Sequence, residues 1–291
     1  MKTFLNKLFI ILIFTIILIL LFKNKNIVNI TTIKSIELWK NYLFPSLFIT
    51  FIINDFLINS NTLNYFNNLF NINNNYILVF ILSIFSSSPT NSLIIKELYN
   101  KKELSINTSN KLLMSTYFSN PLFLYNILSN IFNNNLVIKI IISHYLSNII
   151  IFITKYKKET CISNTNYSCN YSIILLNSIK KSINNMLSIL GIITFFMIIS
   201  NIFITSNNFL GIIIKGLFEI TQSLSMFNNL NINIFIKSIF SLIIISFGGI
   251  SIHMQVYNII NDSNILYKYF LIGRIYQVLY SLLIFILIYY I

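Results

Sequence analysis

The chain is 291 residues long, and 56% of its residues are hydrophobic while 9% are charged. A mean hydropathy of +0.76 excludes a soluble domain with one ordinary core and indicates a polytopic membrane protein in a lipid bilayer. The net charge of +13 does not indicate a nucleic-acid partner, because the lysines are scattered at the edges of hydrophobic runs instead of forming one basic face.

The first apolar run covers residues 4–22, between Lys2 and Lys23, and has the outline of a signal peptide or signal anchor. It is longer than the apolar region of a typical secretory signal, and no small-x-small cleavage site follows it. We therefore expect an uncleaved first helix and assign residues 1–34 to a signal-anchor-like helix and loop.

The first membrane half is expected over residues 35–154. In chain order it holds an amphipathic stretch at 35–41 with Trp39 at the membrane interface, a span at 43–57, a short run at 76–85, an amphipathic stretch at 93–104, a broken run at 112–132 and a full span at 136–154. The run 76–85 is too short to cross a bilayer, so it predicts a half-helix or re-entrant segment.

Residues 155–182 form a basic hydrophilic linker, which the positive-inside rule places in the cytoplasm. Both cysteines of the chain, Cys161 and Cys169, fall in this linker, where we expect reduced thiols without a role. The second membrane half covers residues 183–291, with a full span at 186–204, a shorter run at 210–226, a run at 235–247 and a last region at 265–291.

The two halves share a plan of full span, truncated segment and polar break, which is the outline of an internal repeat. The predicted fold class is an all-α polytopic membrane protein with about eight to ten transmembrane or half-membrane helices, given the lengths of the apolar runs. Two structurally related halves with discontinuous helices are expected.

Four polar clusters interrupt the apolar runs, at residues 86–92, 119–121, 218–222 and 248–255. Because a bilayer leaves no water for unpaired backbone groups, such breaks survive only against protein or around a hydrated cavity. Discontinuous helices are where transporters bind cargo, so the clusters predict a permease. The candidate substrate path is Ser88, Pro89, Thr90, Asn91, Ser119, Asn120, Pro121, Glu219, Thr221, Gln222, Gly248, Gly249, His253 and Gln255.

Glu219 has two interpretations of equal weight. A charged carboxylate at the bilayer centre costs roughly 2.5–3.5 kcal/mol, which an ion pair with Lys215, four residues earlier, would offset. Alternatively, Glu219 binds a coupling ion or substrate. His253, just after the flexible glycine pair, also has two interpretations: it forms an interhelical hydrogen bond, or it belongs to the substrate site.

The hydroxyls at 86–92 predict either an anion site before a helix that begins at Leu93 or an ordinary surface loop. Arg274, inside an apolar run, is expected by a small margin to reach toward the membrane interface. Otherwise it provides, with Lys215, a positive charge for an anionic cargo. His144 is interpreted as a helix-packing residue.

The sequence holds no G-x-S-x-G, P-loop or H-E-x-x-H motif and no paired carboxylates. We therefore expect no enzyme, no cofactor and no metal site. Any energy for transport must come from a gradient.

Six short sequence motifs follow one another along the chain: LFPS at 43–46, SNPLF at 119–123, HYLSN at 144–148, LFEIT at 217–221, GGISIHMQV at 248–256 and LIGR at 271–274. Across nearly the whole chain this order resembles the sporulation integral membrane protein YlbJ family, also called SpoVV, which is itself similar to the nucleoside-recognition Gate membrane proteins. The resemblance implies transport of dipicolinic acid across the outer forespore membrane during sporulation.

The chain departs from that family at its first break. Where the family's pattern looks like S-G-Y-P-x-G-x-K, only Pro89 is kept, with Ser87, Ser88, Asn91 and Leu93 in place of the glycines, tyrosine and lysine. A diverged relative with another cargo is therefore left open.

The expected function is transport of a small organic anion, dipicolinate, in the cell membrane of a sporulating bacterium, namely its outer forespore membrane. The alternatives are a nucleoside or other small-metabolite permease of the same architecture, a non-transporting scaffold of spore assembly, and a sensor or accessory subunit. A homo-oligomer is left open.

Overall fold

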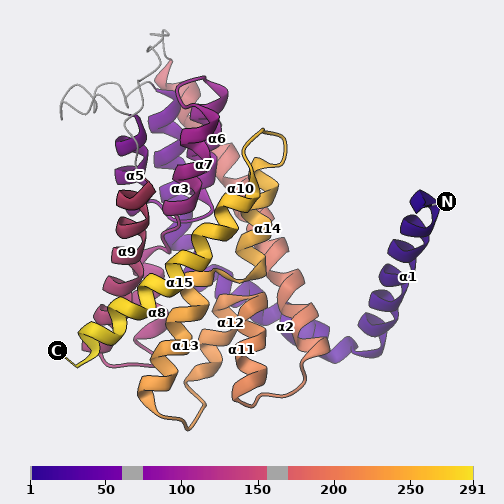
Figure 1. Ribbon diagram of the computed structural model, residues 1–291. Helices are drawn as coiled ribbons and strands as arrows, with labels where there is room; N and C mark the ends of the chain where they lie inside the picture. Colours follow the sequence, from indigo (N-terminus) through magenta and orange to yellow (C-terminus); the bar gives the residue numbers. More distant parts are fainter. Residues whose placement is uncertain (1, 61–74, 156–169, 291) are drawn as a thin grey trace.

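The computed structural model describes residues 2–60, 75–155 and 170–290, and every regular element in these ranges is a helix (Figure 1). Five helical stretches are long and apolar enough to cross a membrane: Lys25–Asn59, Asn134–Lys155, Tyr171–Phe203, Ile234–Ile260 and Tyr267–Tyr289. These spans confirm the class of α-helical membrane protein. The finer expectation of about eight to ten transmembrane or half-membrane helices stays a prediction.

The N-terminal helix α1 (Lys2–Lys23) projects away from the body of the molecule (Figure 1). After a turn at Asn24, α2 (Lys25–Leu38) continues through the π-helical turn Trp39–Leu43 into α3 (Phe44–Asn59). The first span of the body thus begins earlier than the predicted segment at 43–57, and the predicted division after residue 34 falls inside α2. The indole N–H of Trp39 donates to the Met186 carbonyl at 3.1 Å, which anchors this turn to protein.

Next comes a helical hairpin that enters and leaves on the same side of the molecule. Its arms are α5 (Asn75–Phe85) and α6 (Thr90–Asn100), and its tip is residues 86–89; we call it hairpin 1. The short α5 agrees with the predicted half-helix at 76–85, while α6 begins at Thr90 and not at the predicted residue 93.

A broken span and a full span complete this half. The broken span consists of α7 (Ile106–Ser115) and α8 (Pro121–Leu128), separated by the non-helical residues 116–120. The full span is α9 (Asn134–Lys155). The break at the predicted Ser119-Asn120-Pro121 cluster is confirmed, with Pro121 at the first position of α8.

The second half begins with α10 (Tyr171–Phe203), so residues 171–182 of the predicted hydrophilic linker are helical. Helices α11 (Phe209–Phe218) and α12 (Ile220–Phe227) form hairpin 2, whose tip is Glu219. The linker cysteines lie outside the described residues.

Another broken span follows hairpin 2. Its parts are α13 (Ile234–Phe247) and α14 (Gly249–Ile260), and they meet at the predicted glycine break. The last helix, α15 (Tyr267–Tyr289), is again full length.

The two halves therefore follow one order, namely span, hairpin, broken span and full helix, but in opposite directions. Thr31 of α2 bonds Asn201 near the end of α10, whereas Asp55 near the end of α3 meets Lys181 near the start of α10. Hairpin 1 lies in the upper part of Figure 1 and hairpin 2 in the lower part. Opposed repeats of this kind are a recurring architecture of membrane transporters.

The breaks lie at the middle level of the long helices. Leu43, His144, Ile189, Gly248 and Gln277 each stand near the midpoint of one of the five spanning stretches. Two apolar cores flank this level, one around α5, α6, α7 and α14 and the other around α8 and α10 to α13. The polar breaks are thus sandwiched between two hydrophobic layers, at the depth where a bilayer is driest.

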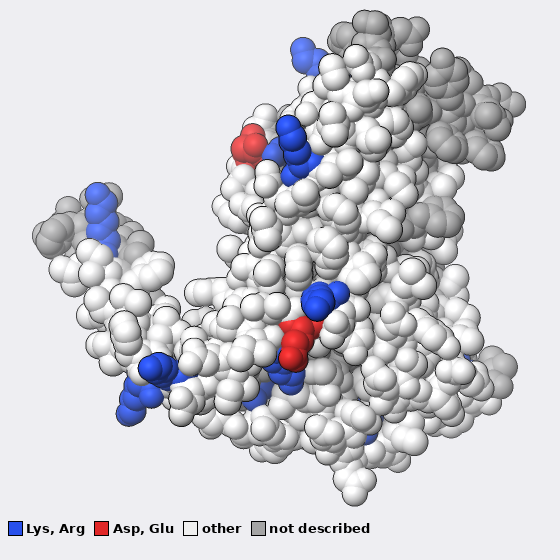
Figure 2. Space-filling view, turned by 180° about the vertical axis from the view of Figure 1, so that it is seen from behind, with Lys and Arg blue, Asp and Glu red and all other residues white. Residues whose placement is uncertain are grey.

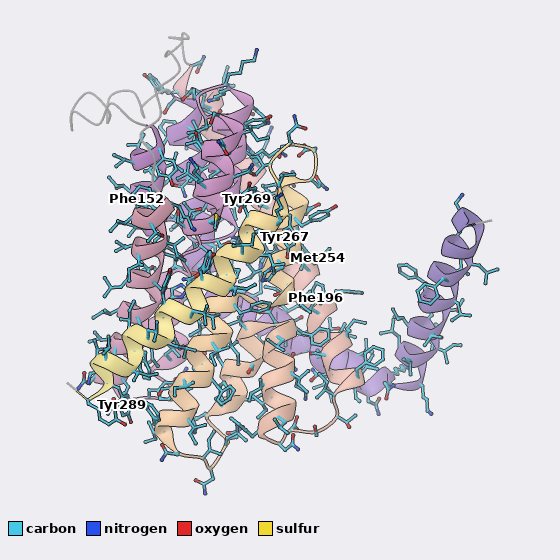
Figure 3. All side chains as sticks on the ribbon, viewed as in Figure 1. Phe152, Phe196, Met254, Tyr267, Tyr269 and Tyr289 are labelled. Carbon is cyan, nitrogen blue, oxygen red and sulfur yellow. The ribbon has the colours of Figure 1, made fainter. Side chains whose placement is uncertain are left out.

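The outer surface suits a lipid environment. The face in Figure 2 carries few charged residues, and Figure 3 shows apolar and aromatic side chains along the helices, with Met254 of α14 45% exposed. Large hydrophobic side chains are exposed along α1, α10 and α15.

Candidate functional site

A cavity lies where the tips of both hairpins meet the break between α7 and α8, and we call it the central cavity. Its polar wall consists of Ser87 and Ser88 of hairpin 1, Ser119 and Asn120 of the broken span, Glu219 and Thr221 of hairpin 2, and Gln255 of α14. Its apolar wall consists of Leu43, Leu47, Phe123, Ile189, Ile193, Ile220 and Ile252. The cavity volume of about 50 Å³ has room for roughly three to five waters.

Two further cavities lie on either side of it. One, of about 40 Å³, shares Ile189 and Gln255 with the central cavity and extends to Asn258 of α14. The other, of about 170 Å³, lies between Tyr42 and Leu224 on the side of hairpin 2. The three cavities follow one another along the helical stretch Lys25–Asn59, which lines the first at Tyr42, the central one at Leu47 and the last at Phe51.

Glu219 forms the tip of hairpin 2 in an extended conformation, with φ −146° and ψ 120°. Its Oε1 accepts hydrogen bonds from the Thr221 amide at 3.2 Å and the Thr221 hydroxyl at 2.9 Å, so the carboxyl caps α12. The predicted ion pair with Lys215 is wrong, because Lys215 Nζ donates to Asn207 Oδ1 at 2.8 Å. No ion pair joins Lys215 and Glu219 in the described part of the chain.

The tip of hairpin 1 rests on the α7–α8 break. The amide of Ser88 donates to the Phe118 carbonyl at 2.9 Å, and the Asn91 side chain donates to the Thr116 carbonyl. The hydroxyls of Ser87 and Thr90 are buried and have no hydrogen-bond partner among the described residues. Ser87 therefore carries a buried, unpartnered hydroxyl in the wall of the central cavity.

The α7–α8 break is held by α9. His144 Nε2 accepts from the Ser119 amide at 3.2 Å, and the Tyr145 hydroxyl donates to the Ser119 carbonyl at 2.9 Å. Asn120 Oδ1 caps the first amides of α8. His144 is fully buried in this contact, in agreement with its interpretation as a packing residue.

The glycine break lies directly against hairpin 2. Gly248 and Gly249 have φ of 98° and 61°, a left-handed conformation that favours glycine. A Cβ on Gly249 would lie 3.3 Å from the Gly216 carbonyl oxygen and 3.4 Å from that of Phe218. Glycine thus permits the two interrupted helices of this half to touch through their backbones.

His253 holds the glycine break together and does not line the central cavity. Its Nε2 lies 3.0 Å from the Phe247 carbonyl oxygen, and its Nδ1 lies 2.6 Å from the Tyr267 hydroxyl. Gln222 is similar, because its amide donates to Asn201 Oδ1 at 2.6 Å and accepts from the Ser200 hydroxyl at 2.9 Å. Both side chains fasten helices together.

Arg274 does not reach the membrane interface, so that prediction is wrong. Its side chain is 0% exposed, its Nη2 donates to the Met114 carbonyl at 2.9 Å, and its guanidinium lies 4.2 Å from the centre of the Tyr117 ring. It does not line the central cavity. Stacking on an aromatic ring offsets part of the cost of burying this cation.

Three further residues at this level were not predicted from the sequence. Asn148 of α9 and Gln277 of α15 both donate to the Tyr117 carbonyl, and the Tyr117 hydroxyl donates to the Ile245 carbonyl at 3.2 Å. The sequence feature that could have predicted Asn148 and Gln277 is an amide side chain in the middle of an apolar span, because a polar group at that depth needs a hydrogen-bond partner.

The structure thus brings together six of the predicted path residues around the central cavity: Ser88, Ser119, Asn120, Glu219, Thr221 and Gln255. The remaining candidates lie near this level without lining the cavity: Pro89, Thr90, Asn91, Pro121, Gln222, Gly248, Gly249, His253, Lys215 and Arg274. Pro89 lines the neighbouring cavity beside α14.

Fold and site together define an α-helical membrane protein with a cavity of mixed polar and apolar lining at mid-depth between two opposed halves. No family model, curated protein or solved structure matches this chain. Among the residues that the structure describes, no group of three His, Cys, Asp or Glu side chains is placed to hold a metal ion.

Proposed function

We propose that this chain is a membrane permease that moves a small solute through the central cavity by alternating access, without ATP. The observation that supports this most is the meeting of two hairpin tips from opposite sides at one cavity. Opposed repeats with discontinuous helices place substrate sites at this depth. The flanking cavities toward either side support a path across the protein.

The proposed cargo is a small organic anion, dipicolinate, carried across the outer forespore membrane during sporulation. This part of the proposal rests on the motif resemblance. It gains support from the lining, since an apolar wall suits an aromatic ring and a wall of hydroxyl and amide groups suits its carboxylates. Three to five waters fill less space than such a ring, so cargo binding requires a hairpin to move.

A second candidate cargo is an uncharged polar metabolite such as a nucleoside. The observation that favours it is the lining itself, which contains no lysine or arginine. In both cases the same cavity carries the solute.

The test is uptake of labelled dipicolinate, and in parallel of labelled nucleosides, into liposomes that contain the full-length chain. Ser87→Ala and Ser241→Ala form a matched pair, because each removes a buried hydroxyl that has no hydrogen-bond partner within the described ranges, but only Ser87 lines the central cavity. Both variants should fold as well as the wild type. We expect Ser87→Ala to reduce uptake about fivefold to tenfold, the effect of one hydrogen bond to the cargo, and Ser241→Ala to leave it unchanged.

The outcomes separate the alternatives. Uptake of nucleosides without dipicolinate would replace the first cargo by the second. Equal uptake by liposomes with and without the protein, for all probes, would remove the permease proposal and favour a membrane scaffold.

A further inference from the structure

The polar wall of the central cavity contains a single ionisable side chain, Glu219. The residue is 3% exposed. Its Oε1 is occupied by Thr221, whereas its Oε2 has no hydrogen-bond partner among the described residues. One oxygen of a buried carboxyl in the cavity wall is therefore left without a partner among the described residues.

Among the residues that the structure describes, no cation pairs with this carboxyl. On its own hairpin, Lys215 is bonded to Asn207. On α14, His253 contacts Phe247 and Tyr267 through its two ring nitrogens, and Ser251 places a hydroxyl beside the carboxyl.

The remaining elements also leave the carboxyl without a cation. On the α7–α8 segment, Tyr117 is the titratable group that interacts electrostatically with Glu219. Arg274 of α15 stacks on the Tyr117 ring and donates a hydrogen bond to the Met114 carbonyl. Helices α3, α8 and α10 present only apolar side chains to the cavity.

An isolated carboxylate at this depth costs far more free energy than a neutral carboxyl does. A proton removes the charge and needs only one acceptor atom. A metal cation would need several oxygen ligands, whereas among the described residues no group of three His, Cys, Asp or Glu side chains is placed to hold one.

We propose that Glu219 is the proton-binding site through which this protein couples solute movement to a pH gradient, an inference that rests on the proposed function. A proton from the water on one side binds Oε2. The neutral carboxyl then donates a hydrogen bond into the cavity, where an anionic cargo without a lysine or arginine partner needs a donor. When hairpin 2 opens, the proton returns to the water on the other side.

The protonation itself is measurable without any cargo. Infrared difference spectra of the full-length protein in lipid at neutral pH, wild type against Glu219→Gln, should show the carbonyl stretch of a protonated carboxyl that only the variant lacks. Glu37→Gln, a change at an exposed carboxyl on α2, is the matched control and should retain that band. A carboxylate signal for Glu219 in place of the protonated band overturns the inference and leaves the permease proposal intact.

Flux provides the second measurement. An inward pH gradient of one unit should drive accumulation of labelled dipicolinate up to about tenfold per coupled proton. Glu219→Gln should abolish this accumulation, whereas Ser241→Ala, outside the cavity lining, should retain it. Accumulation driven by sodium in place of protons, or unchanged pH dependence in Glu219→Gln, contradicts proton coupling. Absence of any exchange, with the infrared band present, rejects the transport function and with it the coupling.

Discussion

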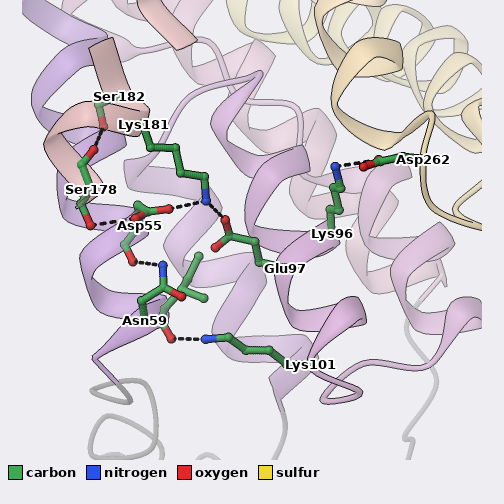
Figure 4. Close-up of polar contacts among 10 residues, drawn as sticks. Asp55, Asn59, Lys96, Glu97, Lys101, Ser178, Lys181, Ser182 and Asp262 are labelled. Atoms are coloured by element: carbon green, nitrogen blue, oxygen red, sulfur yellow. Dashed lines mark hydrogen bonds and ion pairs between the residues drawn. The ribbon is translucent and has the colours of Figure 1, made fainter. Parts of the chain in front are cut away.

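The two hairpins occupy matching places in opposed halves, yet they are fastened by different chemistry. Hairpin 1 is tied by charge, because Lys181 of α10 bridges Asp55 of α3 and Glu97 of α6, and Ser178 adds a hydrogen bond to Asp55 (Figure 4). Hairpin 2 is tied by the neutral hydrogen bonds of Gln222 and by close packing around Gly216.

The difference follows from exposure to water. Lys181, near the start of α10, keeps 39% of its side chain exposed, so water contributes to its solvation. Gln222 is 2% exposed and bonds Ser200 and Asn201 near the opposite end of α10, where a buried charge would be expensive and neutral amides cost less. Hairpin 1 is therefore held by interactions that are costly to break singly, whereas hairpin 2 is held by weaker neutral ones.

The largest effect is expected from Lys181→Met. Without its ammonium group, Asp55 and Glu97 remain as an unpaired carboxylate pair, with side chains 6% and 15% exposed. Breaking a buried ion pair costs about 3–5 kcal/mol, and partial exposure of Lys181 lowers this to about 2–3 kcal/mol. Thermal unfolding in detergent measures the loss; Lys180→Met, at an exposed neighbour on α10, should lose little. Equal stability of the two variants would show that charge does not fasten hairpin 1.

A smaller effect is expected in hairpin 2 from Gly216→Ala. The added Cβ would lie 2.7 Å from Ile244 Cδ1 and 2.8 Å from Ser223 Oγ, so these side chains must shift. Such overpacking costs about 1–3 kcal/mol. The same change at Gly191 of α10 meets nothing within 4 Å and should instead stabilise the helix by about 0.5–1 kcal/mol. Opposite shifts of the two melting temperatures would support close packing at Gly216, and equal shifts would refute it.

The smallest effect is expected at the outer end of hairpin 1. Lys96 lies 2.6 Å from Asp262 and, through this hydrogen bond, holds the pKa of Asp262 below its usual value (Figure 4). A lowered folded-state pKa gives stability that is present above the unfolded pKa and is lost as the pH falls through the folded one. The stability difference between wild type and Asp262→Asn should therefore vanish on acidification and with added salt. A difference that persists at low pH would contradict an ion pair.

Much of the site was predictable because polar groups in an apolar run are conspicuous. The break at Ser119-Asn120-Pro121 and the glycine pair were placed correctly, since proline and glycine act on the local backbone. The contacts that the side chains of Lys215 and Arg274 make were not predictable from the sequence. Whether a long cationic side chain reaches outward, pairs with the carboxylate of Glu219 or stacks on Tyr117 depends on which helices pack beside it.

The sequence by itself determined that this is an α-helical membrane protein with interrupted spans, because apolar length and polar breaks are local properties of the chain. Only the tertiary structure decided that the second half runs opposite to the first and that both hairpin tips meet at one cavity. The physical reason is that helix direction and the contacts at mid-depth arise between segments far apart in sequence. No local pattern encodes which carboxyl will be left there without a cation.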